Sequence, residues 1–98
     1  MLIKKVSIII PVYNEKKTIQ KCLDKVLSTK IYDFEKEIVI SDNNSNDGTK
    51  ELLKNLNHSN VKILFRETNE GKGANIINAI SHVSGDIVIM QDADLEYS

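Results

Sequence analysis

Two carboxylates lie one residue apart near the end of this chain, directly after an apolar segment. Residues 86–90 read DIVIM, and Asp92 and Asp94 follow them, with Glu96 two positions further on. Alternate side chains of an extended segment point the same way, and carboxylates about 6 Å apart repel by on the order of 1 kcal/mol in water. A divalent cation removes that repulsion, and Mg²⁺ and Mn²⁺ prefer carboxylate oxygens as ligands. The spacing therefore predicts a metal site, and the alternative is a solvated acidic turn.

Aromatic and polar side chains follow the first apolar segment, in the sequence PVYNE of residues 11–15. Pro11 has no N–H to donate, so we expect it to end a strand. Tyr13 offers a face on which a base can stack, and Asn14 and Glu15 offer an amide and a carboxylate to a base or a ribose. The alternative is that Asn14 caps a helix and Glu15 stabilises its first turn.

A second polar loop, SDNNSNDGT, occupies residues 41–49. Asp42 and Asn43 lie nearest the preceding apolar segment, so they are candidates for reading a base. Asp47 and Gly48 are typical of a turn that leads into a helix, and we expect them to be structural.

A third loop, NEGKGAN at residues 69–75, resembles a phosphate-binding loop only in part. The full pattern G-x-x-x-x-G-K-[ST] is absent, and a tight entry into a helix explains Gly71 and Gly73. Lys72 remains a candidate contact for a phosphate or a ribose.

Four short apolar segments, rich in β-branched residues, alternate with three stretches of helical period. The segments are 6–10, 37–40, 61–65 and 86–90, and the helical stretches are 16–29, 48–57 and 73–84. Continuous apolar runs suit strands covered on both faces, and their alternation with helices favours a parallel sheet. We therefore expect a Rossmann-like α/β fold of three layers with the strand order 3-2-1-4. In that order the polar loops converge at the carboxyl ends of the strands, where ligands bind.

The composition is that of one ordinary globular domain, residues 1–98. The net charge of −1 argues against a nucleic-acid partner. Cys22 lies on an apolar helix stripe with Ile19 and Leu23, so we expect it in the core, and as the single cysteine it indicates a reduced, cytoplasmic setting. A G-x-G-x-x-G motif after the first strand and a G-x-S-x-G motif are both absent, which argues against a dinucleotide oxidoreductase and a serine hydrolase.

Four fragments in order give the chain a family resemblance: SIIIPVYNE, EIVISDNNSNDGT, NEGKGANIINAI and SGDIVIMQDADLEY. Together they resemble the N-terminal, donor-binding half of a family 2 glycosyltransferase with the GT-A fold, in the branch of the dolichol-phosphate and polyprenol-phosphate mannosyltransferases. The resemblance implies nucleotide-sugar contacts at Pro11, Val12, Tyr13, Glu15, Ser41, Asp42, Asn43, Lys72, Asp92, Ala93 and Asp94. It implies Mg²⁺ or Mn²⁺ on Asp92, Asp94 and Glu96, and we expect Asp94 to be the principal ligand.

The resemblance also implies an activity, the transfer of a sugar from a GDP- or UDP-sugar, with a polyprenyl phosphate as the suggested acceptor. Residues that act on the acceptor would lie beyond Ser98, so the chain would be a truncated GT-A domain, and the full-length protein could be membrane-associated. The alternative is a non-catalytic nucleotide-binding or interaction fragment. We expect an uncovered apolar edge at the fourth strand, and a dimer through it. One departure matters: relatives frequently carry Asp where this chain has Asn43, which leaves the base open.

Overall fold

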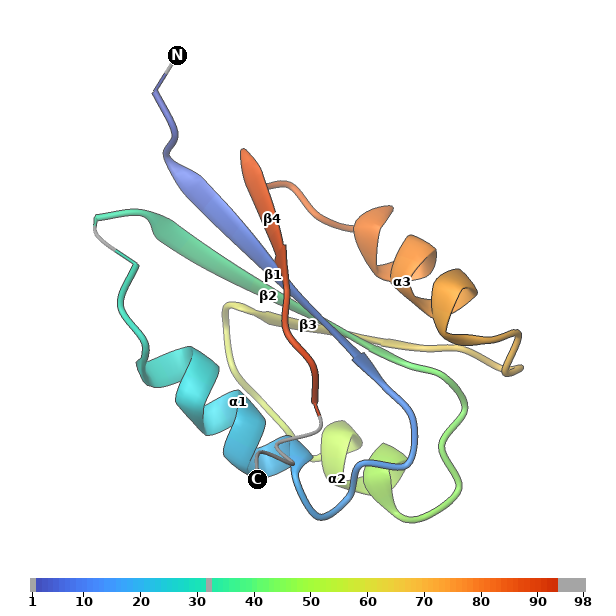
Figure 1. Ribbon diagram of the computed structural model, residues 1–98. Helices are drawn as coiled ribbons and strands as arrows, with labels where there is room; N and C mark the ends of the chain where they lie inside the picture. Colours follow the sequence, from blue (N-terminus) through green and yellow to red (C-terminus); the bar gives the residue numbers. More distant parts are fainter. Residues whose placement is uncertain (1, 32, 94–98) are drawn as a thin grey trace, which may run out of the picture.

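Four parallel strands form the sheet of this protein, in the order β3-β2-β1-β4 (Figure 1). The computed structural model describes residues 2–31 and 33–93. Its elements along the chain are β1 (Lys5–Val12), α1 (Ile19–Ser28), β2 (Glu35–Asp42), α2 (Thr49–Lys54), β3 (Val61–Phe65), α3 (Lys72–Ile80) and β4 (Ile87–Met90). The predicted element order, parallel sheet and strand order are confirmed.

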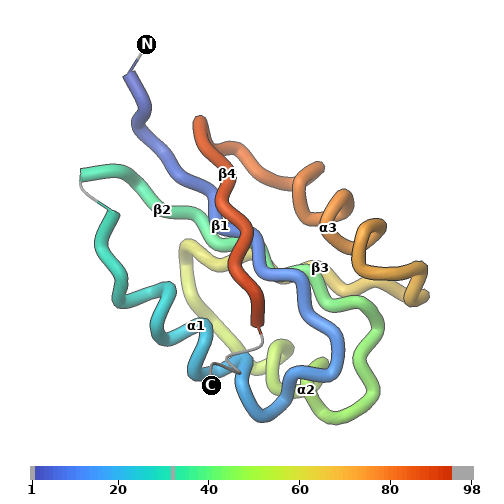
Figure 2. Tube along the Cα trace, viewed as in Figure 1, coloured from blue at the N-terminus to red at the C-terminus, as the bar shows by residue number. Residues whose placement is uncertain are grey.

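Helices cover the sheet on both faces, with α1 and α2 on one side and α3 on the other (Figures 1 and 2). The larger core cluster joins β1 residues such as Ile8 and Ile10 to Leu23 of α1 and Leu53 of α2. The smaller cluster joins Ile9 and its neighbours on the opposite face of the sheet to α3. This division follows from the two-residue period of the strands. Cys22 is buried in the larger cluster, as predicted.

The helices are shorter than the sequence predicts. Helix α1 begins at Ile19 rather than at residue 16, because a turn comes first in which the Glu15 carbonyl accepts from the N–H groups of Thr18 and Ile19. Helix α2 ends at Lys54 and α3 ends at Ile80, before the predicted ends at 57 and 84. Ser81 is the C-cap residue of α3, and Gly85 lies in the segment between α3 and β4.

Pro11 does not end the first strand, contrary to prediction, and pairs with Ser41 inside it. The Ile9 carbonyl accepts from Gln91 N–H on the β4 side, whereas the Val12 carbonyl accepts from Asn43 N–H on the β2 side. Directions alternate along a strand, so the nitrogen of Pro11 faces the β4 side, where β4 has already ended at Met90. The missing N–H therefore falls just past the last β1–β4 hydrogen bond, which Gln91 N–H donates to the Ile9 carbonyl.

Strand β4 is exposed along its whole length, unlike β1. Between 38% and 49% of the surface of Ile87, Val88, Ile89 and Met90 is accessible. The expectation of cover on both faces is wrong for this strand, whereas the expected apolar surface is confirmed. A dimer through it stays a prediction. In residues 2–31 and 33–93, no helix is long and apolar enough to span a membrane.

The Glu37 carboxylate connects the loop before β4 to the amino-terminal end of the sheet through hydrogen bonds. Its carboxylate accepts from Ser7 Oγ at 2.6 Å, from Ser84 N–H at 2.9 Å and from Ser84 Oγ at 3.1 Å. Burial alone would raise the pKa of the Glu37 carboxyl, but the hydrogen bonds from Ser7 and Ser84, with Lys5 nearby, hold this pKa below its usual value. The ionised carboxylate therefore stabilises the fold.

We expect Glu37→Gln to lower the free energy of unfolding by about 1–3 kcal/mol at neutral pH, because an amide replaces the charged acceptor. The pKa of the Glu37 carboxyl is lower in the folded state than in the unfolded state, where it is about 4.3. Its contribution to stability is therefore fully present above pH 4.3, and it is lost as the pH falls through the folded-state pKa. Chemical denaturation from pH 7 to pH 3 should show a smaller acid loss for the variant. The control is Glu35→Gln, at a side chain that is 70% exposed. Equal acid profiles for Glu37→Gln and the unsubstituted chain would contradict this role.

Candidate functional site

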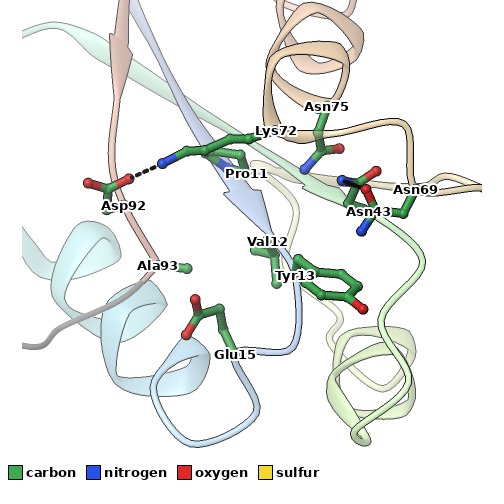
Figure 3. Close-up of a pocket in the computed structure, with 10 residues that line it drawn as sticks. All are labelled: Pro11, Val12, Tyr13, Glu15, Asn43, Asn69, Lys72, Asn75, Asp92 and Ala93. Atoms are coloured by element: carbon green, nitrogen blue, oxygen red, sulfur yellow. Dashed lines mark hydrogen bonds and ion pairs between the residues drawn. The ribbon is translucent and has the colours of Figure 1, made fainter.

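A cavity of about 380 Å³ lies at the carboxyl ends of β1, β2 and β4, beside the start of α3 (Figure 3). Its size falls in the range of small-ligand sites, roughly 300–1,000 Å³. The lining residues are Pro11, Val12, Tyr13, Glu15, Asn43, Asn69, Lys72, Asn75, Asp92 and Ala93. All of these except Asn69 and Asn75 are candidates from the sequence. The loops after β1, β2 and β4 therefore converge as the strand order predicts, and the loop before α3 joins them.

Asn14 ties two of these loops together and does not cap α1, whose N-cap residue is Thr18. The Asn14 side chain donates to Asn46 Oδ1 at 3.0 Å and accepts from Asn46 N–H at 2.8 Å, while its own N–H donates to Ser45 Oγ. Asn14 has a φ of 52°, a left-handed conformation that asparagine tolerates. The turn leaves Tyr13 45% exposed beside the cavity.

Ser41 and Asp42 are fully buried and do not line the cavity. Ser41 Oγ donates to Asn75 Oδ1 at 2.7 Å, and Asn75 Nδ2 donates to the Ser41 carbonyl at 2.9 Å. The Asp42 carboxylate accepts from the N–H and the hydroxyl of Ser45. These residues hold α3 and the loop after β2 in place around the cavity.

Asp47 and Gly48 are structural, as predicted. The Asp47 carboxylate accepts from Thr49 N–H at 3.0 Å at the start of α2, and Gly48 has a φ of 104°. Burial alone would raise the pKa of Asp47, but the hydrogen bonds from Thr49 and from Lys16 N–H lower this pKa overall.

Asn43 reaches the cavity with one atom unsatisfied. Its Nδ2 donates to Asn69 Oδ1 at 2.9 Å and to the Gly71 carbonyl at 3.3 Å. Its Oδ1 is buried and accepts no hydrogen bond from the described part of the chain. A buried acceptor left without a donor costs about 1–3 kcal/mol. This oxygen is not accessible from the cavity, so a ligand can reach it only if the Asn43 side chain moves.

The opposite end of the cavity carries charge. Lys72 Nζ lies 3.4 Å from Asp92 Oδ1, and both side chains are more than half exposed (Figure 3). The backbone of Asp92 is held by Cys22, whose thiol donates to the Asp92 carbonyl at 3.5 Å. Burial raises the pKa of that thiol, so Cys22 acts here as a neutral donor. The Asp92 carboxylate stays accessible to a cation or a ligand.

The predicted metal ligands Asp94 and Glu96 lie outside the described residues. Within residues 2–31 and 33–93, the search for three or more His, Cys, Asp or Glu side chains able to hold one metal ion found none. Asp92 offers the hard oxygen that Mg²⁺ or Mn²⁺ requires, and its one ion pair here is with an exposed lysine. Asp92 is therefore suitable as one ligand of a divalent metal whose other ligands are oxygen atoms from other groups.

Comparison with known proteins identifies a family. Residues 7–98 match the model of the family described as glycosyl transferase family 2. The dolichyl-phosphate beta-glucosyltransferase ALG5A of Trichomonas vaginalis is 40% identical over 96 residues, which are 90% of this chain and 30% of that protein.

Two solved structures share the fold. The mannosyltransferase PcManGT from Pyrobaculum calidifontis, solved in complex with GDP-Man and Mn²⁺, matches with a TM-score of 0.82 at 29% identity, over 91% of this chain and 27% of that one. S. aureus TarS 1-349 in complex with UDP-GlcNAc matches with a TM-score of 0.80 at 32% identity, over 92% of this chain and 26% of that one. The chain spans about 30% of the length of the curated relatives that it matches, and a similar share of these two solved structures.

Proposed function

Because the chain belongs to glycosyl transferase family 2, we propose that it forms the donor-binding part of an enzyme that transfers a sugar from a GDP- or UDP-sugar. The observation that carries the proposal is the cavity at the carboxyl ends of the strands, with an exposed aromatic ring at one end and an accessible carboxylate at the other. A nucleoside diphosphate has the matching groups: a base that can stack on an aromatic ring, and phosphates that bind cations.

The base belongs at the end formed by Tyr13 and Asn43. The exposed ring of Tyr13 offers a stacking face, and Asn43 lines the cavity beside it. The diphosphate belongs at the end formed by Lys72 and Asp92, where an exposed ammonium can contact phosphate oxygens (Figure 3).

Asp92 and Asp94 would hold a divalent metal with Glu96, and Asp94 would be the principal ligand. Bound there, Mg²⁺ or Mn²⁺ would act as a Lewis acid on the leaving diphosphate and neutralise its developing charge. Among similar proteins, the mannosyltransferase from Pyrobaculum calidifontis was solved with Mn²⁺. Lys72 supplies positive charge at the same end from this chain's own residues.

The acceptor in this proposal is a polyprenyl phosphate. The support is the similarity to proteins named for such acceptors, among them the dolichyl-phosphate beta-glucosyltransferase of Trichomonas vaginalis. A phosphate acceptor is ionised at neutral pH, so it could attack without a general base from the protein.

Calorimetric titration with a panel of UDP- and GDP-sugars, with and without Mn²⁺, tests the donor site. We expect at least one sugar nucleotide to bind with a Kd on the order of the micromolar to millimolar KM values of enzymes, and to bind more tightly with Mn²⁺. ADP-glucose serves as the control nucleotide. If no member of the panel binds in either condition, the donor-site proposal is wrong. If a nucleotide binds, transfer is assayed with a protein that also contains the acceptor-binding half, and no transfer to a polyprenyl phosphate in that assay would contradict the acceptor proposal.

A further inference from the structure

We infer that the outer side of α1, with the residues that flank this helix, binds the surface of a bilayer that contains anionic lipids. This surface, called here the basic face, is formed by five exposed lysines: Lys16, Lys17, Lys21, Lys25 and Lys30. The inference concerns a surface outside the donor cavity, but the choice of a lipid partner rests on the proposed acceptor, a polyprenyl phosphate.

Positive charge is concentrated in this part of the chain. Residues 16–30 hold five lysines and a single acid, Asp24, which gives the segment a net charge of +4. The whole chain carries −1, so the other 83 residues, with eight basic and 13 acidic side chains, carry −5. The low net charge therefore conceals a strongly uneven distribution.

The lysines lie on the side of α1 that faces away from the sheet. The opposite side packs on the core through its buried stripe (Figure 1), which is Ile19, Cys22, Leu23 and Val26. With 3.6 residues per turn, Lys21 and Lys25 lie one turn apart on the exposed side, and Lys17 lies one turn before Lys21. The charges are thus displayed on one side of the molecule, where a flat surface can meet several of them together.

The positions of these lysines do not stabilise the start of the helix. The N-terminus of a helix is the positive end of its dipole and favours acidic side chains. Helix α1 has no acidic residue in its first turn, and Lys16 and Lys17 come shortly before it. Within residues 2–31 and 33–93, no carboxylate forms an ion pair with Lys17 or Lys21. Folding does not account for these charges, which favours a role in binding.

A bilayer with anionic lipids has the complementary charge and shape. Each lysine held close to such a surface strengthens binding by about fivefold, the equivalent of about 1 kcal/mol. Charges more than about 8 Å apart are largely screened at physiological ionic strength. The molecule measures 25 Å along its shortest principal axis, so acidic side chains on its far side would not cancel this attraction.

The basic face begins beside the donor cavity. Glu15 lines the cavity, and Lys16 is the next residue along the chain. A polyprenyl phosphate is held in a bilayer by its hydrocarbon chain. Binding of the basic face to that bilayer would therefore bring the cavity close to the plane in which the acceptor phosphate lies.

Sedimentation of the chain with lipid vesicles, without nucleotide and at physiological salt, tests the inference. The chain should bind vesicles of phosphatidylcholine with phosphatidylglycerol, and bind vesicles of phosphatidylcholine alone much more weakly. The double variant Lys17→Gln/Lys21→Gln should weaken binding to the anionic vesicles by about 25-fold, which is about fivefold for each lysine. The matched control is Lys4→Gln/Lys62→Gln, which removes the same charge elsewhere. Lys62 donates to the His82 carbonyl on the α3 side, so this variant should bind as the unsubstituted chain does.

Four outcomes would overturn the inference. An equal loss in both double variants would assign binding to total charge and not to α1. Equal binding to both kinds of vesicle would point to an apolar contact, such as the exposed strand β4. Binding of a DNA duplex as tight as that of anionic vesicles would show a general affinity for polyanions. If neither kind of vesicle binds, the inference fails, while the donor site is judged separately by the nucleotide titration.

Discussion

The Asp94→Asn substitution is expected to weaken Mn²⁺-dependent binding of a nucleoside diphosphate by about a hundredfold. It removes one charge at nearly constant shape. Loss of a partner outside the direct ligands of a metal already costs about 10- to 100-fold in affinity, and loss of a direct ligand should reach the upper end. Asp94 is preferred over Asp92 because it is farther from the strand end in the sequence and would extend farther over the diphosphate. The position of Lys72, 3.4 Å from Asp92 Oδ1, adds to this preference, since the Asp92 charge already has a partner.

Titration of Mn²⁺ with UDP or GDP checks this assignment, with Asp92→Asn as the matched variant. Asp92→Asn should weaken binding less, because it removes a contact to the ribose or to a shared metal. A large loss in Asp92→Asn beside unchanged binding in Asp94→Asn would reverse the two roles. If neither substitution changes the Mn²⁺ dependence, the metal site itself is disproved.

The sheet could be predicted from the sequence because each strand and each helix has its own local pattern of apolar residues, and these patterns alternate along the chain. Each strand is a short apolar run, such as Ile8, Ile9 and Ile10, and each of the first three runs is followed by a helical stripe. Right-handed crossovers then leave few ways to order four parallel strands. The exposure of β4 could not be predicted from its own residues, since Ile87 and Val88 look like the buried residues of β1.

The details that sequence reasoning missed depend on contacts between distant segments. Pro11 remains inside β1 because β4 ends early on that side, a fact that PVYNE does not contain. Asn14 pairs with Asn46, 32 residues away, which overrides its local preference for a helix cap.

The candidate site also contains residues that could be predicted from the sequence and residues that could not. The residues at strand ends, such as Tyr13, Asn43 and Asp92, could be found because parallel strands bring their carboxyl ends together. Asn69 and Asn75 were missed because NEGKGAN was interpreted through its glycines as a helix entry. The available signal was that its two asparagines flank the start of α3, beside the same strand ends.

Gly85→Ala is expected to destabilise the fold by about 3 kcal/mol, since overpacking against rigid atoms costs about 1–3 kcal/mol and sometimes more. A Cβ at this position would lie 2.7 Å from the backbone nitrogen of Ser7 and would also meet Ser7 Oγ. Ser7 cannot move away, because it lies inside β1 between two paired strands and its hydroxyl donates to Glu37. The Gly85 N–H, which donates to Ser7 Oγ at 2.8 Å, would be displaced as well.

Gly73→Ala is the matched control, with the opposite expected sign. Gly73 lies in α3, and a Cβ there meets no atom within 4 Å. Alanine should therefore raise the free energy of unfolding by about 0.5–1 kcal/mol, because it reduces the entropy of the unfolded chain and favours the helix. Chemical denaturation of both variants measures the difference. If Gly85→Ala unfolds at the same denaturant concentration as Gly73→Ala, then β4 can shift relative to β1, and the loop before β4 does not hold that strand in register.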